Sequence, residues 1–208
     1  MFVFAGSSAE FALNKAVDWL YFTGKLPSDP IGRLFSTVLY ARRIVFSDLD
    51  SANKAIDQIT SIHSAVENKR GSKIPDWAYR DVLFMLIYYS QASYELLVRK
   101  MSEKEKEEMF DVFNRVGIRM GIKNLPVNYK EWLEVREKHL RQDLMKSDLT
   151  TDLYKQYRKH LGSWRFKILL ESQKMVLPEY VSDLLGFRKI HWFRPLIFLY
   201  KSGVSRFS

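Results

Sequence analysis

The chain has 208 residues, of which 47% are hydrophobic and 27% are charged, a composition typical of one globular domain and not of a disordered chain. The absence of cysteine excludes disulfides, cysteine-ligated zinc, ordinary iron–sulfur clusters and a thiolate haem ligand. The net charge of +9 suits a nucleic acid, an anionic membrane or an acidic cofactor, but no nucleic-acid-binding module is recognisable, so we predict no nucleic-acid partner.

Targeting and membrane signals are weak. The apolar start of the chain is short and lacks a basic region before it, which argues against a signal peptide. The longest apolar stretch, residues 81–98, is interrupted by Ser90, Gln91 and Ser93 and falls short of a membrane span. We therefore predict a cytoplasmic protein, and a membrane-associated one is the alternative.

Helix signals follow one another from the N-terminus. Ser7 and Glu10 have capping-box spacing and predict a first helix that stops at Gly24 and Pro27. A second helix is expected over residues 29–46, and a third over residues 48–71, where acidic and Ser caps precede it and Lys69, Arg70 and Gly71 close it.

The second half continues in the same way. Residues 77–101 form the longest candidate helix, apolar on every face over residues 82–89 and therefore central. A capping box at Ser102 and Glu105 starts the next helix. Residues 127–145 form another, and its apolar side carries Trp132, Leu133, Val135 and Leu140.

The remaining residues divide at Gly162, Pro178 and Gly186 into shorter helices. No useful strand alternation or internal repeat is found. The prediction is an all-α, single-domain bundle of about seven to nine helices spanning residues 1–208.

One histidine stands out. In the segment ITSIHSAVENK, His63 shares a helical stripe with Ile56, Ile59 and Val66, so its imidazole is expected to point inward. It would meet a hydrogen-bond partner in a core, a catalytic neighbour or a metal. Glu67 stands at i+4, but two ligands do not complete a zinc or di-iron site. We interpret Glu67 as a solvated carboxylate. A single axial bond from His63 to haem iron is still compatible with the sequence, because it needs only one imidazole.

The other histidines are less telling. His139 and His160 are flanked by charge and are interpreted as solvated, and His191 adjoins aromatic residues and is buried or interfacial. No nucleophile elbow and no phosphate-binding glycine loop is present, which weakens the common hydrolase and nucleotide-binding interpretations. Arg33 and Thr37 lie four residues apart on one predicted helix face. On spacing alone, Arg33 caps or pairs near the helix start and Thr37 packs.

The segments DPIGRLFSTVLYARRIVFSD and ITSIHSAVENK resemble the family of haem-dependent oxygenases that contains bacterial rubber oxygenase (latex-clearing protein) and the fungal oxygenase MpaB. A looser likeness continues from about Gly6 to about Phe187. The resemblance implies a globin-like helical core that binds haem b, with His63 as the axial iron ligand and Arg33 and Thr37 at the haem pocket. It implies an O2-dependent oxygenase whose substrate is apolar, with an isoprenoid chain as one candidate.

On this resemblance, Arg33 would hold a haem propionate or a polar distal partner, and Thr37 would hydrogen-bond bound oxygen. Ser36 replaces the lysine that caps the distal iron in rubber oxygenase, so that closed form is not expected. Asp18 is a weak candidate for the family's catalytic base. The family usually has sequence before the FAG segment, so the chain is either a compact member or truncated at its N-terminus.

The C-terminal segment, residues 187–207, mixes basic and large apolar side chains, a composition compatible with contact to an anionic bilayer. The alternative for this segment is a last helix packed on the bundle. The alternative function for the whole chain is a non-catalytic helical protein of the same fold that binds a membrane surface or a protein partner.

Overall fold

The computed structural model describes residues 2–24, 29, 39–188, 193, 195, 197 and 199–201. The named helices are α1 (Phe2–Leu13), α2 (Val17–Phe22), α5 (Leu49–Arg70), α6 (Asp76–Leu97), α7 (Glu103–Arg119), α8 (Tyr129–Asp143), α9 (Asp148–Lys174) and α10 (Glu179–Leu185), and residues 39–46 are also helical. Within these ranges the structure has no named strand, only an isolated bridge between Asn14 and Leu144. The all-α prediction is confirmed.

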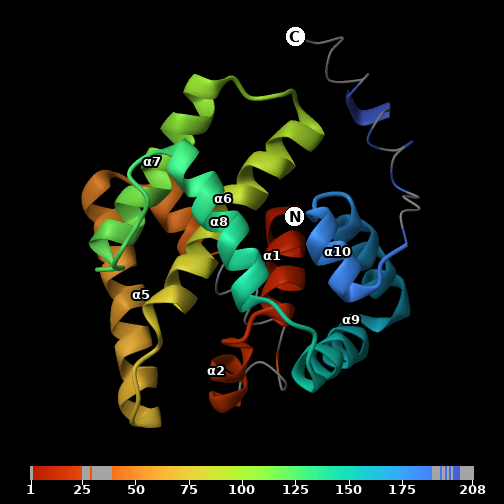
Figure 1. Cartoon of the computed structure of the whole chain (residues 1–208), viewed down its shortest axis with the longest axis horizontal. Coiled ribbons are helices and arrows are strands. Elements are labelled where there is room, and N and C mark those ends of the chain that lie inside the picture. The colour runs from red at the N-terminus through yellow and green to blue at the C-terminus, as the bar shows by residue number, and fades with distance from the viewer. Residues whose placement is uncertain are drawn as a thin grey trace.

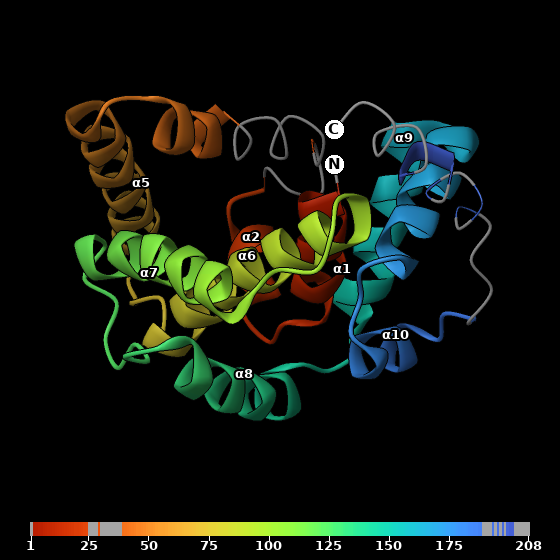
Figure 2. The same cartoon turned by 90° about the horizontal axis from the view of Figure 1, so that it is seen from above.

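Helices α1 and α6 occupy the middle of the molecule. Figure 1 shows α5 and α7 on one side of this pair and α9 and α10 on the other, and Figure 2 shows the same division from above. Helix α1 packs against both α6 and α9, and α6 also packs against α7 and α8. None of the helices in the described ranges is long and apolar enough to cross a membrane.

Close packing joins the two central helices. Tyr89 of α6 is fully buried, and a Cβ added at Gly6 of α1 would lie 2.2 Å from the Tyr89 ring. Only glycine leaves room for that ring. As the apolar run predicts, α6 buries Leu83, Phe84 and Ile87 in a core shared with Trp132 of α8.

A buried ion pair ties α1 to α8. The Arg136 guanidinium donates to both carboxylate oxygens of Glu10, over 3.0 and 2.8 Å, and the Tyr89 hydroxyl donates to the same carboxylate. Both charged side chains are at most 5% exposed. Arg136 also lies over the Tyr88 ring, 4.5 Å from its centroid. The polar groups of this pair are therefore satisfied inside the core.

The prediction of one first helix capped by Ser7 and Glu10 is wrong. The helix already begins at Phe2, and Glu10 turns into the core to meet Arg136. The chain then breaks after Leu13 because the Asn14 side chain accepts from the Ala16 N–H and the Asn14 backbone bridges to Leu144. Helix α2 starts only at Val17.

The later helix signals agree better with the structure. Asp48 caps α5 and left-handed Gly71 ends it, and the predicted Ser102–Glu105 capping box is present at the start of α7. In α8, Trp132 and Leu140 are buried as expected, but Leu133 is 46% exposed, so its assignment to the apolar side is wrong. Of the predicted helix 29–46, residues 39–46 are helical and residues 30–38 lie outside the described residues.

The last predicted divisions are confirmed in part. Helix α9 runs past Gly162 but is kinked there, because the φ of 72° and ψ of 167° at this residue are not helical. Glycine adopts these values without strain. Pro178 precedes α10, and Gly186 ends it in the left-handed conformation.

Candidate functional site

His63 lies near the middle of α5, where the helical stripe predicts it. Its side chain is half-buried, and its ring meets the Tyr79 ring of α6 edge-on, with centroids 5.2 Å apart and an interplanar angle of 66°. On the same stripe Ile56 is buried, and Ile59 and Val66 are half-buried. The expectation that His63 faces inward is confirmed.

A cavity of about 460 Å³ adjoins the imidazole. It is bounded by α5, by the turn into α6 and by the end of α7, and its lining includes Thr60, His63, Glu67, Ile74, Tyr79 and Ile122. Apolar side chains from the turn and from the end of α7 therefore share this space with the imidazole and with polar groups of α5.

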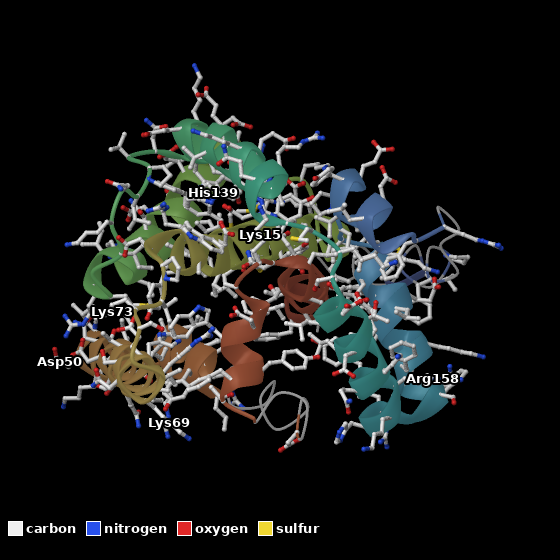
Figure 3. The ribbon with its side chains drawn as sticks, turned by 60° about the horizontal axis from the view of Figure 1, so that its bottom comes forward. Lys15, Asp50, Lys69, Lys73, His139 and Arg158 are labelled. Atoms are coloured by element: carbon white, nitrogen blue, oxygen red, sulfur yellow. The ribbon has the colours of Figure 1, made fainter. Side chains whose placement is uncertain are left out.

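Glu67 corrects the sequence interpretation. Its side chain is only 8% exposed, not solvated. Its carboxylate accepts from the Lys73 ammonium at 2.7 Å, the Ile74 N–H at 2.9 Å and the Tyr79 hydroxyl at 3.2 Å. Burial alone raises the pKa of Glu67, but the bonds from Lys73, Ile74 and Tyr79 outweigh it, so the net pKa is lowered. Figure 3 labels Lys73 near α5.

The Glu67 carboxylate holds the turn between α5 and α6 through the Ile74 N–H. It also holds the Tyr79 ring, which lies beside His63, through the Tyr79 hydroxyl. Burial, together with the charge of Glu67 and the hydrogen bond to it, raises the pKa of Tyr79 well above its ordinary value. Tyr79 therefore stays a neutral hydrogen-bond donor at physiological pH. With its oxygens engaged in the turn, Glu67 is a poor second ligand for a metal at His63.

The remaining residues of the expected site are only partly placed. Arg33, Ser36, Thr37 and His191 lie outside the described residues. Asp18 of α2 is described. Its carboxylate pairs with Arg70 of α5 at 2.6 Å, and the Asp18 side chain is 45% exposed.

The Asp18 pair belongs to a contact between α2 and α5. The Arg70 guanidinium also lies 4.0 Å from the centroid of the Trp19 ring and 5.3 Å from that of Phe22. In this structure Asp18 therefore joins two helices, and its partner Arg70 lies at the end of α5, beyond His63.

His139 is not the solvated histidine that its charged flanks suggest. Its side chain is 13% exposed, and its Nδ1 lies 2.6 Å from Asp81 Oδ1 and 2.8 Å from Asp143 Oδ2. The spacing of His139 and Asp143, at i and i+4 on one helix face, was the available local signal. Asp81 comes from α6, 58 residues earlier, and no local pattern points to it.

His160 of α9 also departs from the solvated interpretation, because it is half-buried and its Nε2 is covered by protein. Of the histidines in the described ranges, His63 is the one that lines the cavity between α5, α6 and α7.

Comparison with known proteins gives one family. Residues 2–200 match the model described as ER-bound oxygenase mpaB/B′/rubber oxygenase, catalytic domain. Comparisons with curated proteins and with solved structures gave no significant match. The matched range includes both the His63 cavity and the group of polar side chains around His139.

Proposed function

Because the chain belongs to the family of the mpaB and rubber oxygenase catalytic domain, we propose that it is a haem b-dependent oxygenase with His63 as the axial iron ligand. The observation that carries the proposal is the half-buried imidazole of His63 beside a cavity of about 460 Å³. The family description supports oxygenase chemistry. The haem and its ligand are our inference from the resemblance of the His63 segment to this family and from the surroundings of His63.

The donor set of the cavity fits haem better than a metal held by side chains alone. A zinc or non-haem iron site needs three or more protein ligands. Among the residues that line this cavity, His63 is the imidazole, and Glu67 already accepts from three donors. Haem iron needs only one axial imidazole, because the porphyrin supplies four nitrogens.

The side chains around His63 would fix its ring. Tyr79 contacts the imidazole edge-on, and Glu67 holds the Tyr79 hydroxyl and the backbone of the turn. Such outer contacts set the orientation of a ligating histidine. Bound haem would supply oxygen activation, while this chain would position the imidazole and the substrate.

We further propose that Arg33 and Thr37 act at the haem pocket, as the family resemblance implies. Arg33 would bind a propionate or a polar group by charge-assisted hydrogen bonds, and Thr37 would donate a hydrogen bond to oxygen. Asp18 is a poor candidate for the base, because Arg70 already pairs with its carboxylate. The proposal therefore assigns it no catalytic step.

The proposed substrate is an apolar molecule, with an isoprenoid chain as one candidate, and O2 is the co-substrate. Peripheral contact with a membrane would bring such a substrate within reach. The exposed side chains of Leu199 and Tyr200, at 66% and 53%, support this part of the proposal, and Lys201 follows them. Most of the C-terminal basic and aromatic segment lies outside the described residues.

Absorption spectroscopy of the purified protein tests the haem. After reconstitution with haemin we expect a Soret band at one haem per chain, a shift on reduction with dithionite and a further shift with carbon monoxide. A protein that stays colourless and takes up no haemin would contradict the proposal. It would favour the non-catalytic alternative, in which the same fold binds a membrane or a protein partner.

A further inference from the structure

A second group of polar side chains lies between α1, α6 and α8, away from the His63 cavity. Asp81 extends from α6, and His139 and Asp143 extend from the last turns of α8. One ligand atom from each, the His139 Nδ1 and one oxygen of each carboxylate, lie within 4.8 Å of one another. Figure 3 labels His139 and Lys15 near the middle of the molecule.

The charges in this group are poorly balanced without a cation. Two carboxylates face the same imidazole nitrogen, which carries at most one proton. Burial raises the pKa of Asp81, the hydrogen bond and charge of His139 oppose that shift, and the charge of Asp143 adds to it. The nearby Lys15 ammonium donates to the Gln142 carbonyl.

The surrounding structure holds the ligand atoms in place. The Asn14 Oδ1 accepts from the Ala16 N–H at 2.8 Å, which fixes its amide so that Nδ2 donates to Asp81 Oδ2 at 2.6 Å. The other Asp81 oxygen faces His139. The Phe84 ring meets the His139 ring edge-on, with centroids 5.6 Å apart.

Backbone bonds close the site on the α8 side. The Lys15 N–H donates to the Asp143 carbonyl at 2.9 Å, and the Met145 N–H donates to the Leu13 carbonyl at 2.8 Å. The break after α1 and the end of α8 are thus clamped together at the point where the three side chains meet. Outer contacts of this kind typically orient the ligands of a metal ion.

We propose that Asp81, His139 and Asp143 form a binding site for one divalent transition-metal ion of the Zn²⁺ class. One imidazole nitrogen with two carboxylate oxygens is a donor set that Zn²⁺ accepts with water in a fourth position. The 13% and 16% exposure of His139 and Asp143 leaves a side open for that water. Mg²⁺, which prefers an all-oxygen octahedron, fits this set poorly.

A tetrahedral ion would need modest rearrangement. With metal–ligand distances of about 2.1 Å, neighbouring ligand atoms lie roughly 3.4 Å apart, whereas the nitrogen–oxygen distances here are 2.6 and 2.8 Å. His139 and Asp143 lie at the more exposed edge of the group, where their side chains can open. The ion would then link the break after α1, helix α6 and helix α8, so its binding should stabilise the folded protein.

The test is titration of tag-free, chelator-treated protein with Zn²⁺ by calorimetry, with thermal unfolding in parallel. We expect one Zn²⁺ per chain and a raised Tm, and no comparable effect of Mg²⁺. Asp143→Asn, at the more exposed edge, should weaken binding by about tenfold or more, and His139→Gln should abolish it. The matched control His160→Gln should bind as the wild type does.

Two results would overturn the metal site. One is the absence of Zn²⁺ binding to folded wild-type protein. The other is binding that keeps its stoichiometry and affinity in both His139→Gln and Asp143→Asn. Circular dichroism establishes that each variant is folded, and if His139→Gln is not, Asp143→Asn decides alone. The haem spectrum is a separate readout, so failure at this site leaves the function of His63 untouched.

Discussion

Glu67 and Asp81 are both nearly buried carboxylates, yet their surroundings act on them in opposite directions. Glu67 accepts from a lysine, a backbone N–H and a tyrosine, and its pKa is lowered. Asp81 is deeper, lies near a second carboxylate, and its pKa is raised. The Glu67 carboxylate thus has a cation and two further donors, whereas beside His139 two carboxylates face one imidazole nitrogen. This difference favours a cation held by carboxylates in the second region and not in the first.

The largest effect is expected where a buried charge loses its partner. Arg136→Ala leaves the Glu10 carboxylate in the core without its guanidinium partner, and should lower the free energy of unfolding by about 3–5 kcal/mol. Urea denaturation measures this loss. The control Arg141→Ala removes an exposed arginine from the same helix and should cost less than about 1 kcal/mol. Equal losses in the two variants would contradict the larger contribution to stability that we assign to the buried Arg136.

A smaller effect is expected at the turn between α5 and α6. Glu67→Gln keeps the shape of the side chain but removes its charge, and should cost about 2 kcal/mol at pH 7, in the range of a hydrogen bond to a charged group. The haem Soret band should persist, because Glu67 is not proposed as a ligand. Loss of haem in a fully folded Glu67→Gln protein would show that Glu67 does more than hold the turn.

The smallest effect, and the sharpest contrast, lies in the dependence of stability on pH. For Glu67, whose folded pKa lies below 4.5, the stabilisation is present above that pH and is lost as pH falls through the folded pKa. For Asp81, the folded pKa lies above the ordinary value of 3.8. Its ionisation in the folded protein therefore costs stability as pH rises from 3.8 through the folded pKa.

Relative to the wild type, Glu67→Gln should therefore recover stability on acidification, and Asp81→Asn should gain stability as pH rises from about 4 towards 7. Denaturation at a series of pH values, without metal, measures both trends. A flat difference from the wild type in both variants, below pH 4.5 for Glu67→Gln and above pH 3.8 for Asp81→Asn, would contradict the contrast between the regions.

Local signals predicted the parts of the fold that depend on local contacts. The cap at Asp48, the left-handed Gly71 and the capping box at Ser102 form within a few residues, and the structure has all three. The break after Leu13 depends on a bridge between Asn14 and Leu144, which are far apart in the sequence, so the early helix could not be bounded from its own residues.

The candidate sites divide in the same way. The apolar stripe of one helix was enough to predict that His63 points inward. The interpretation of His139 was wrong because its neighbours in sequence are charged, while its partner Asp81 arrives from another helix. The interpretation of Glu67 was wrong because Lys73, Ile74 and Tyr79 reach it only after the chain turns at Gly71. Burial of a polar group depends on such partners, which a helical stripe does not contain.

The most direct test of the haem ligand is His63→Gly reconstituted with haemin, with and without added imidazole. The variant should lose the wild-type Soret and reduced carbon-monoxide spectra, and millimolar imidazole should restore them by filling the space that the side chain leaves. His160→Gly serves as the control and should keep the wild-type spectra throughout. A His63→Gly protein that binds haem with the wild-type spectra in the absence of imidazole would contradict the assignment of His63.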